Sequence, residues 1–205
     1  MLHRAHRVTE DEYLAADLAD EVRLEFVNGE IVAMSGVTDA HSTIRGNVEY
    51  ALQSQLRGRT PCRVHGPDLR VRIDETGMYA YPDVVVYCGK PDYAPTKPES
   101  LLNPRVIVEV LSESTESYDL GAKAAHYRQR PSVQGIVMID SLRKRVVVWR
   151  RLGPTQWQLD DLTDGEFAVP GVEATLSFAA IYEAWTPPGE ADTAENDAPT
   201  PTTGD

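Results

Sequence analysis

A run of aliphatic residues, VIVEVL at 106–111, contains a single carboxylate, Glu109. An unbroken run of β-branched and aliphatic residues is typical of a strand that is buried on both faces of a sheet. An unpaired carboxylate in that setting is strongly unfavourable unless it loses its charge. The run therefore predicts a central strand, and Glu109 needs a partner that makes its burial tolerable.

A second carboxylate, Asp83, stands at the start of another aliphatic run, PDVVVY at 82–87. Both runs suit central strands that lie side by side, in which case the two carboxylates meet at one end of the sheet. A divalent cation would favour this arrangement, because carboxylate oxygens balance its charge. Two alternatives stay open: a buried ion pair between Glu109 and Lys123, and an Asp83 that only caps a backbone group at the start of its strand.

The N-terminal half contains three further elements. TEDE at 9–12 has the pattern of a capping box and predicts a short helix. NG at 28–29 separates two alternating stretches and predicts a β-hairpin with a type I′ turn. A longer helix is predicted from about residue 38 to residue 57, because its apolar residues follow the helical spacing.

A helix predicted from about residue 112 to residue 130 follows the Glu109 strand. Asp119, Lys123 and Tyr127 stand four residues apart in it and line one face. The short connection brings that face back over Glu109. Beside a phosphate and a metal-bound water, a lysine can orient the nucleophile or stabilise the charge of the transition state.

These features resemble the Uma-type restriction endonuclease family, which belongs to the PD-(D/E)XK nuclease superfamily. The resemblance rests on PDVVV at 82–86, on VIVEVLSEST at 106–115 and on the spaced Asp119, Lys123 and Tyr127. It extends upstream to RLEFVNGEIVAMSG and His41 and downstream to SVQGIVMID and VVVWRR, so that it covers about residues 9–185.

The resemblance implies an α/β (α+β) fold of the restriction endonuclease-like type, in which helices flank a central mixed β-sheet and an N-terminal β-hairpin precedes it. It implies a Mg²⁺ or Mn²⁺ ion held by Asp83 and Glu109. Glu25 matches the upstream acid of the family, and the main-chain carbonyl of Val110 is a further expected ligand.

The implied catalytic residues are Asp83, Glu109 and Lys123. The residue two positions after Glu109 is Leu111, where the wider superfamily has a lysine. In the resembling family this lysine lies on the following helix, which here points to Lys123.

His41, Asp119 and Tyr127 are the expected supporting residues around the site. Each also has an ordinary interpretation: a surface histidine, an acid at a helix start and a packed tyrosine. The implied activity is metal-dependent hydrolysis of DNA phosphodiester bonds by an endonuclease, and a homodimer is expected because both strands must be engaged. The alternative is an inactive protein of the nuclease fold that acts as a binding or interaction module.

Composition limits these interpretations. The net charge of −12 argues against a protein that coats nucleic acid by charge alone. The basic residues of 143–151 fall on one predicted hairpin and favour a solvated turn over a nucleic-acid contact. No apolar run approaches the roughly 20 residues of a membrane span, and the N-terminus lacks the apolar core of a secretory signal, so cytoplasmic residence is expected.

The predicted organisation is a single nuclease-like domain at 9–185, a flexible N-terminus at 1–8 and a disordered, acidic and proline-rich tail at 186–205. Cys62 and Cys88 form no CxxC motif, and we predict that both are reduced thiols in or near the core.

Overall fold

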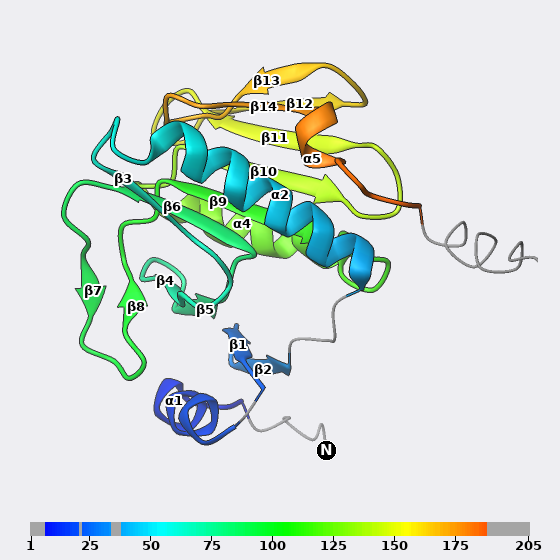
Figure 1. The fold of residues 1–205 in the computed structure, drawn as a ribbon. Helices are drawn as coiled ribbons and strands as arrows, with labels where there is room; N and C mark the ends of the chain where they lie inside the picture. Colours follow the sequence, from blue (N-terminus) through cyan, green and yellow to red (C-terminus); the bar gives the residue numbers. More distant parts are fainter. Residues whose placement is uncertain (1–6, 21, 34–37, 188–205) are drawn as a thin grey trace, which may run out of the picture.

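The computed structural model describes residues 7–20, 22–33 and 38–187 (Figure 1). The predicted flexible N-terminus (1–8) and the predicted disordered tail (186–205) lie largely outside these residues and stay predictions. Mixed β-sheets with several helices confirm the predicted α/β (α+β) class. In the described ranges, no helix is long and apolar enough to cross a membrane.

The Glu109 strand lies inside a six-stranded sheet with the order β12-β11-β10-β9-β6-β3. Its strands are β3 Cys62–His65, β6 Val84–Cys88, β9 Val106–Leu111, β10 Gly135–Asp140, β11 Val146–Arg151 and β12 Trp157–Leu162. The pair β9–β10 is parallel, and the other neighbouring pairs are antiparallel. This mixed sheet confirms that the two carboxylate-bearing runs belong to neighbouring strands.

A second sheet of short strands, in the order β2-β1-β5-β4-β8-β7, lies below the first in Figure 1. Its strands are β1 Leu24–Val27, β2 Glu30–Ala33, β4 Val71–Ile73, β5 Met78–Ala80, β7 Tyr93–Ala94 and β8 Ser100–Leu101. The predicted hairpin is confirmed as β1–β2, and Asn28 and Gly29 have φ angles of 53° and 83°, as a type I′ turn requires. A small sheet pairs β13 Glu166–Ala168 with β14 Thr175–Ser177.

Helices cover both faces of the larger sheet. The helix α2 Asp39–Leu56 lies on one face, and α3 Glu116–Tyr118, the π-helix η1 Asp119–Lys123 and α4 Ala124–Gln129 follow one another on the other face. The helix α1 Glu10–Ala19 packs against β1 of the second sheet, and α5 Phe178–Ile181 packs against α2. On the α2 face, Ile44 and Val48 pack in one core with Val108 of β9. On the opposite face, Ala124 and Tyr127 of α4 pack with Ile107. Alternate residues of β9 thus face different helices, which explains why apolar residues occupy successive positions on both sides of Glu109.

The predicted helix at 112–130 differs from the structure, which divides it into α3, the π-helical turn η1 and α4. Gly121 lies in the middle of η1, and glycine has a weak preference for the regular α-helix. Single π-helical turns inside α-helices occur frequently at functional sites.

The prediction of reduced cysteines is wrong, because Cys62 and Cys88 form a disulfide. The two residues stand directly opposite each other in the antiparallel pair β3–β6, with their Cα atoms 3.9 Å apart. Their separation of 26 residues in the sequence conceals this pairing.

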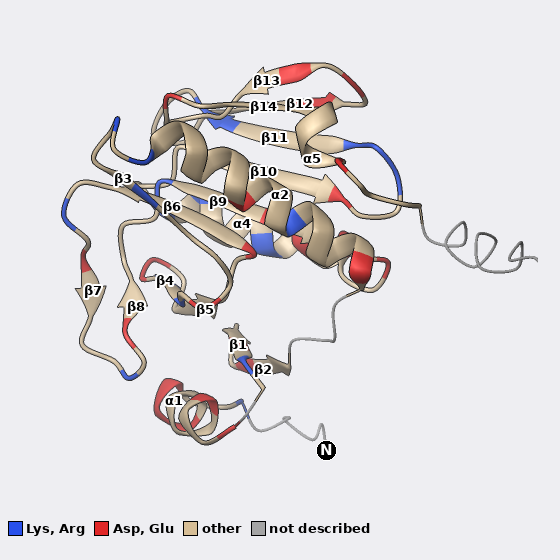
Figure 2. Cartoon of the chain, in the orientation of Figure 1, with Lys and Arg blue, Asp and Glu red and all other residues tan. Residues whose placement is uncertain are grey.

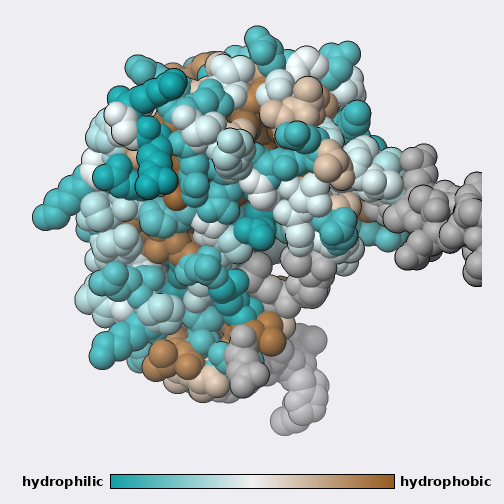
Figure 3. All heavy atoms as spheres, viewed as in Figure 1, coloured by the Kyte–Doolittle hydropathy of each residue, from teal (hydrophilic) through white to brown (hydrophobic). Residues whose placement is uncertain are grey.

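The surface is mainly polar. Figure 2 shows acidic and basic residues on most elements, with basic segments where α2 ends and β3 begins. The face drawn in Figure 3 is largely hydrophilic, with small hydrophobic areas between polar ones. Hydrophobic residues are therefore concentrated in the cores between the sheets and helices.

Candidate active site

Asp83 and Glu109 lie beside each other at one end of the strand pair β6–β9. The last residues in register are Val84 and Val108, so Asp83 and Glu109 occupy the next positions of the two strands. Asp83 reaches across to β9, where its Oδ2 accepts a hydrogen bond of 2.7 Å from the backbone N–H of Val110. The register explains why two acids far apart in the sequence share one location.

Lys123 lies among three carboxylates. Its Nζ is 2.9 Å from Glu25 Oε1, 3.0 Å from Glu109 Oε1 and 3.7 Å from Asp119 Oδ1. All four side chains are buried. The arrangement brings together residues from β1, β9 and η1, and the sequence had assigned all of them to one site.

The helix that follows β9 positions Lys123 and its neighbours. Asp119 opens the π-helical turn η1 and Lys123 ends it, and both point into the interior. Tyr127, one turn further along in α4, donates a hydrogen bond of 2.6 Å from its hydroxyl to Glu109 Oε1. Asp119, Lys123 and Tyr127 therefore lie on one face of the helical segment, as predicted.

Backbone and histidine donors orient the remaining carboxylates. Glu25 Oε1 accepts a hydrogen bond of 3.1 Å from the N–H of Tyr81. His41 lies in the first turn of α2, and its Nε2 is 2.8 Å from Asp83 Oδ1. Since a carboxylate accepts, His41 carries a proton on Nε2 in this contact. The interpretation of His41 as a surface residue is wrong, because it is buried.

Acidic groups outnumber basic groups in this site. Four buried carboxylates, from Glu25, Asp83, Glu109 and Asp119, face one lysine and one histidine. Burial raises the pKa of Glu109 to about 8, against the opposing effect of Lys123, and the other acids add to the rise. Burial also raises the pKa of Asp119.

The lysine keeps its charge. Burial lowers the pKa of Lys123, but Glu109, Glu25 and Asp119 together raise it well above its ordinary value. The ammonium therefore acts as the counter-ion of the cluster.

The donor set fits a hard divalent cation in its chemistry, because carboxylate and carbonyl oxygens are the ligands that Mg²⁺ and Mn²⁺ prefer. In the described part of the chain, however, no three acidic, histidine or cysteine side chains are grouped as they would be around a metal ion. The Lys123 ammonium instead lies in contact with both Glu25 and Glu109. A cation bound to these carboxylates would take over the charge compensation that Lys123 now provides.

Tyr118 is a residue that sequence reasoning missed. Its hydroxyl is buried and has no hydrogen-bond partner among the described residues. Burial and then the negative charge of Glu25 raise the pKa of this hydroxyl. In the sequence, its position directly before Asp119 was the only available signal.

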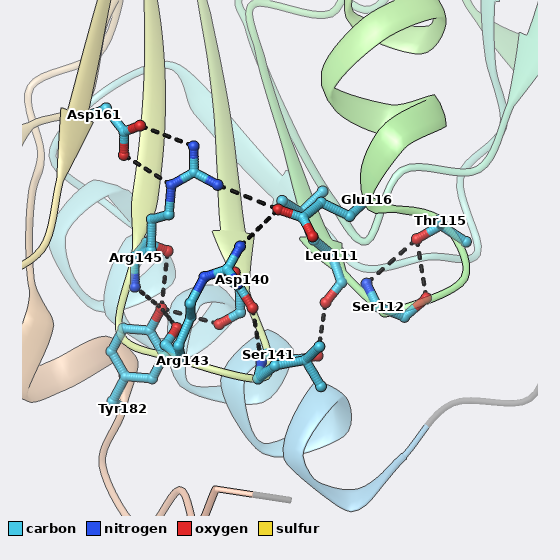
Figure 4. A network of polar contacts seen from close by, with 11 residues as sticks. Leu111, Ser112, Thr115, Glu116, Asp140, Ser141, Arg143, Arg145, Asp161 and Tyr182 are labelled. Atoms are coloured by element: carbon cyan, nitrogen blue, oxygen red, sulfur yellow. Dashed lines mark hydrogen bonds and ion pairs between the residues drawn. The ribbon is translucent and has the colours of Figure 1, made fainter.

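The predicted basic hairpin is engaged in ion pairs (Figure 4). Arg143 contacts Glu116 and Asp140, each at 2.8 Å, and Arg145 contacts Asp161 at 2.8 Å and Glu116 at 3.2 Å. These contacts hold the β10–β11 turn against the start of α3, beside the end of β9. The two arginines therefore have an internal structural role.

Comparisons with known proteins find similar sequences. A family model named Uma2 and described as "Putative restriction endonuclease" matches residues 10–179. Two uncharacterised proteins of Synechocystis sp. are similar: sll1609 is 32% identical over 174 residues, which cover 85% of this chain and 95% of that protein. The second, slr1290, is 30% identical over 151 residues, 74% of this chain and 78% of that protein.

A solved structure also resembles this fold. It is a crystal structure from Anabaena variabilis, described as "a putative nuclease belonging to DUF820", and it matches with a TM-score of 0.68. The match covers 87% of this chain and 98% of that chain at 20% identity, a likeness of fold.

Proposed function

Since this chain belongs to the Uma2 family, we propose that it is a divalent-metal-dependent endonuclease that hydrolyses DNA phosphodiester bonds. One observation carries the proposal: three buried carboxyl groups contact a single lysine, and a fourth, that of Asp83, lies beside Glu109 and contacts His41. A purely structural cluster of this composition is costly, because buried charges need full compensation. A cation and a phosphate group would complete the balance.

Asp83 and Glu109 would hold Mg²⁺ or Mn²⁺, with Glu25 and the main-chain carbonyl of Val110 as further ligands. When bound, such an ion polarises the scissile phosphate and lowers the pKa of the attacking water. The hydrogen bonds from the Val110 N–H, His41 and Tyr127 fix the carboxylate oxygens of Asp83 and Glu109 in advance. This pre-organisation supports the proposal, since ligands that are held in place need less reordering on binding.

Lys123 would place the attacking water or stabilise charge on the phosphate. Its ammonium already lies within 3.0 Å of Glu25 and Glu109, so it is next to any group that these acids hold. Asp119, at 3.7 Å, keeps the lysine charged and directed toward the cluster. The carboxylates raise the pKa of Lys123 well above its ordinary value, which suits this residue as a cation and hydrogen-bond donor and not as a general acid or base.

Tyr118 would donate a hydrogen bond from its hydroxyl group to an oxygen of the bound phosphate. Its support is the buried hydroxyl without a partner in the described residues, close enough to the site for Glu25 to affect its pKa. A buried donor without an acceptor is unfavourable, and a bound phosphate removes that penalty.

A non-cleaving binding module is the alternative. It is favoured by one observation: Lys123 already contacts Glu25 and Glu109, and no three ligating side chains are grouped within the described ranges. In that case the cluster is a structural ion-pair network, and protein partners would replace DNA.

A homodimer that engages both strands and residence in the cytoplasm complete the proposal. The disulfide between Cys62 and Cys88 argues against residence in the cytoplasm, because disulfides are rare in reducing compartments. Sedimentation of the full chain with and without duplex DNA tests the dimer, and thiol titration of protein isolated from its host tests the compartment.

A plasmid cleavage assay tests the activity. The full chain is incubated with supercoiled DNA and Mn²⁺, beside Glu109→Gln and the control Glu113→Gln, which changes an exposed acid of the following loop. The proposal predicts nicked or linear product for the parent and the control and none for Glu109→Gln. Equal product in all three would mean a contaminating nuclease, and no product in any of them favours the binding module.

A further inference from the structure

A cavity of about 860 Å³ lies at the end of α2 that is distant from His41. It is lined by Gln53 and by residues 57–64, the segment that connects α2 with β3. None of the residues of the candidate active site takes part in it. The cavity is therefore a separate feature of the surface.

Three arginines, Arg57, Arg59 and Arg63, line this cavity, and no aspartate or glutamate does. We refer to these residues and the cavity as the arginine pocket. All three are exposed, and none forms an ion pair in the part of the chain that the structure describes. Carboxylates pair with the arginines at positions 23, 45, 70, 72, 130, 143 and 145. The arginines at positions 105, 150 and 151 donate to backbone carbonyls, and Arg128 lies over the ring of Trp149.

The contrast is informative because acids outnumber bases in this chain, 32 to 20. Arg57 and Arg59 have no side-chain contact with a carboxylate, a carbonyl or an aromatic ring among the described residues. Figure 2 shows the basic segments together where α2 meets β3, and the corresponding surface of Figure 3 is hydrophilic. The arginine pocket is thus a local basic site on an acidic protein, where an anion is attracted without being repelled by adjacent acids.

The fold holds this segment in place. Gly58 adopts a φ of 74°, and the N–H groups of Arg59 and Thr60 both donate to the carbonyl of Leu56 at 3.2 Å. The disulfide from Cys62 to Cys88 then fixes the segment to β6. The arginines are therefore presented from a constrained backbone, which lowers the entropy lost on binding.

We propose that the arginine pocket binds phosphate groups of a nucleic-acid strand, at a site apart from the candidate active site. Guanidinium groups match phosphate oxygens in charge and in hydrogen-bond geometry. This inference rests on the proposed nuclease function in one respect: that function identifies the bound strand as DNA.

The length of α2 gives the distance between the two sites. At a rise of 1.5 Å per residue, the helix separates His41 from Arg57 by roughly 24 Å. This distance corresponds to about seven nucleotides at 3.4 Å per nucleotide. A strand whose scissile bond lies near Asp83 and Glu109 would thus meet the arginine pocket about seven nucleotides away.

Fluorescence anisotropy in EDTA tests this binding without cleavage. A labelled duplex of 30 base pairs is titrated with the full-length parent, with the double variant Arg57→Gln/Arg59→Gln and with the control Lys97→Gln/Lys144→Gln. The control removes the same charge from exposed lysines elsewhere. We expect roughly tenfold weaker binding for the arginine variant. The slope of the logarithm of the binding constant against the logarithm of the salt concentration should become less steep by up to about 0.9 for each lost phosphate contact. The control should match the parent.

Three results would overturn the proposal: equal affinity and salt dependence for both variants, no binding of duplex by the parent, or a pocket that binds inorganic phosphate but gives no arginine-dependent strand binding. A six-base-pair duplex is too short to reach both sites. When it is bound at the active site, its affinity should be the same for the parent and for the arginine variant. Arginine-dependent duplex binding by a chain that binds no Mn²⁺ would support this inference and remove the nuclease proposal, so the two failures are distinguishable.

Discussion

Lys123 Nζ lies 3.0 Å from Glu109 Oε1 in a site where both side chains are buried. The same ammonium also contacts Glu25, and the hydroxyl of Tyr127 binds the same Glu109 oxygen. Glu109 is therefore tolerated in a core strand because its carboxyl group contacts a lysine and a tyrosine and, in our proposal, binds a metal ion. The contact joins the two interpretations of the sequence, since the ion pair and the metal ligand involve the same carboxylate.

Replacing Lys123 by methionine is expected to destabilise the metal-free protein by about 3–5 kcal/mol, because it leaves buried carboxylates without their counter-ion. Added Mn²⁺ should recover more stability in this variant than in the parent, since the ion would replace the lost charge. Urea unfolding with EDTA and with Mn²⁺ measures both effects. The control Lys144→Met changes an exposed lysine and should leave stability unchanged. A variant without any response to Mn²⁺ would contradict the shared-carboxylate account.

The stability of the metal-free protein should fall as the pH rises from about 4.5 to about 8. Burial raises the pKa of Glu109 from 4.5 to about 8. In this window the unfolded state releases the Glu109 proton first, so the folded state binds more protons and loses stability with rising pH. Glu109→Gln should weaken this dependence. Urea unfolding in EDTA at several pH values provides the test, and an unchanged slope in the variant would disprove the assignment.

Tyr118→Phe should lower DNA cleavage at least tenfold while leaving the protein as stable as the parent or more stable. The hydroxyl has no partner among the described residues, and a buried unsatisfied donor costs roughly 1–3 kcal/mol. Tyr127→Phe is the matched comparison, because it removes a hydrogen bond to Glu109 and should destabilise by about 1.5–3 kcal/mol. Thermal unfolding and kcat/KM are measured for both. Loss of stability in Tyr118→Phe would mean that its hydroxyl has a structural role.

Reduction of the disulfide should destabilise the protein without abolishing metal binding. Closing a loop of this size contributes about 3–4 kcal/mol, and the cross-link lies at the end of β6 remote from Asp83. The double variant Cys62→Ser/Cys88→Ser should show the same loss as the reduced parent in urea unfolding. If dithiothreitol changes neither stability nor the number of titratable thiols, the bond is not formed in solution.

Much of the site could be predicted from the sequence because its residues lie in recognisable local patterns. Acids inside aliphatic runs identified Asp83 and Glu109, and a spacing of four identified Asp119, Lys123 and Tyr127. The structure brings these residues together through the β6–β9 register and the turn η1. Their catalytic and metal-binding roles stay predictions.

Other features depend on contacts between distant segments, and local patterns do not reveal them. The disulfide needs Cys62 and Cys88 to be opposite each other in β3 and β6, a register that the sequence leaves open. Tyr118 differs from other tyrosines only in where its hydroxyl points. The π-helical turn contains Gly121, and a periodic helical pattern does not predict this turn.

Calorimetric titration of the full chain with Mn²⁺ tests the central claim most directly, because it requires no knowledge of the DNA substrate. Parallel titrations use Asp83→Ala, Glu109→Ala and the exposed control Glu113→Ala. The account predicts binding by the parent and the control and its loss in both site variants, each shown to be folded by circular dichroism. A folded parent that binds no Mn²⁺ would contradict it, and Lys123 would then be the only counter-ion of the buried carboxylates.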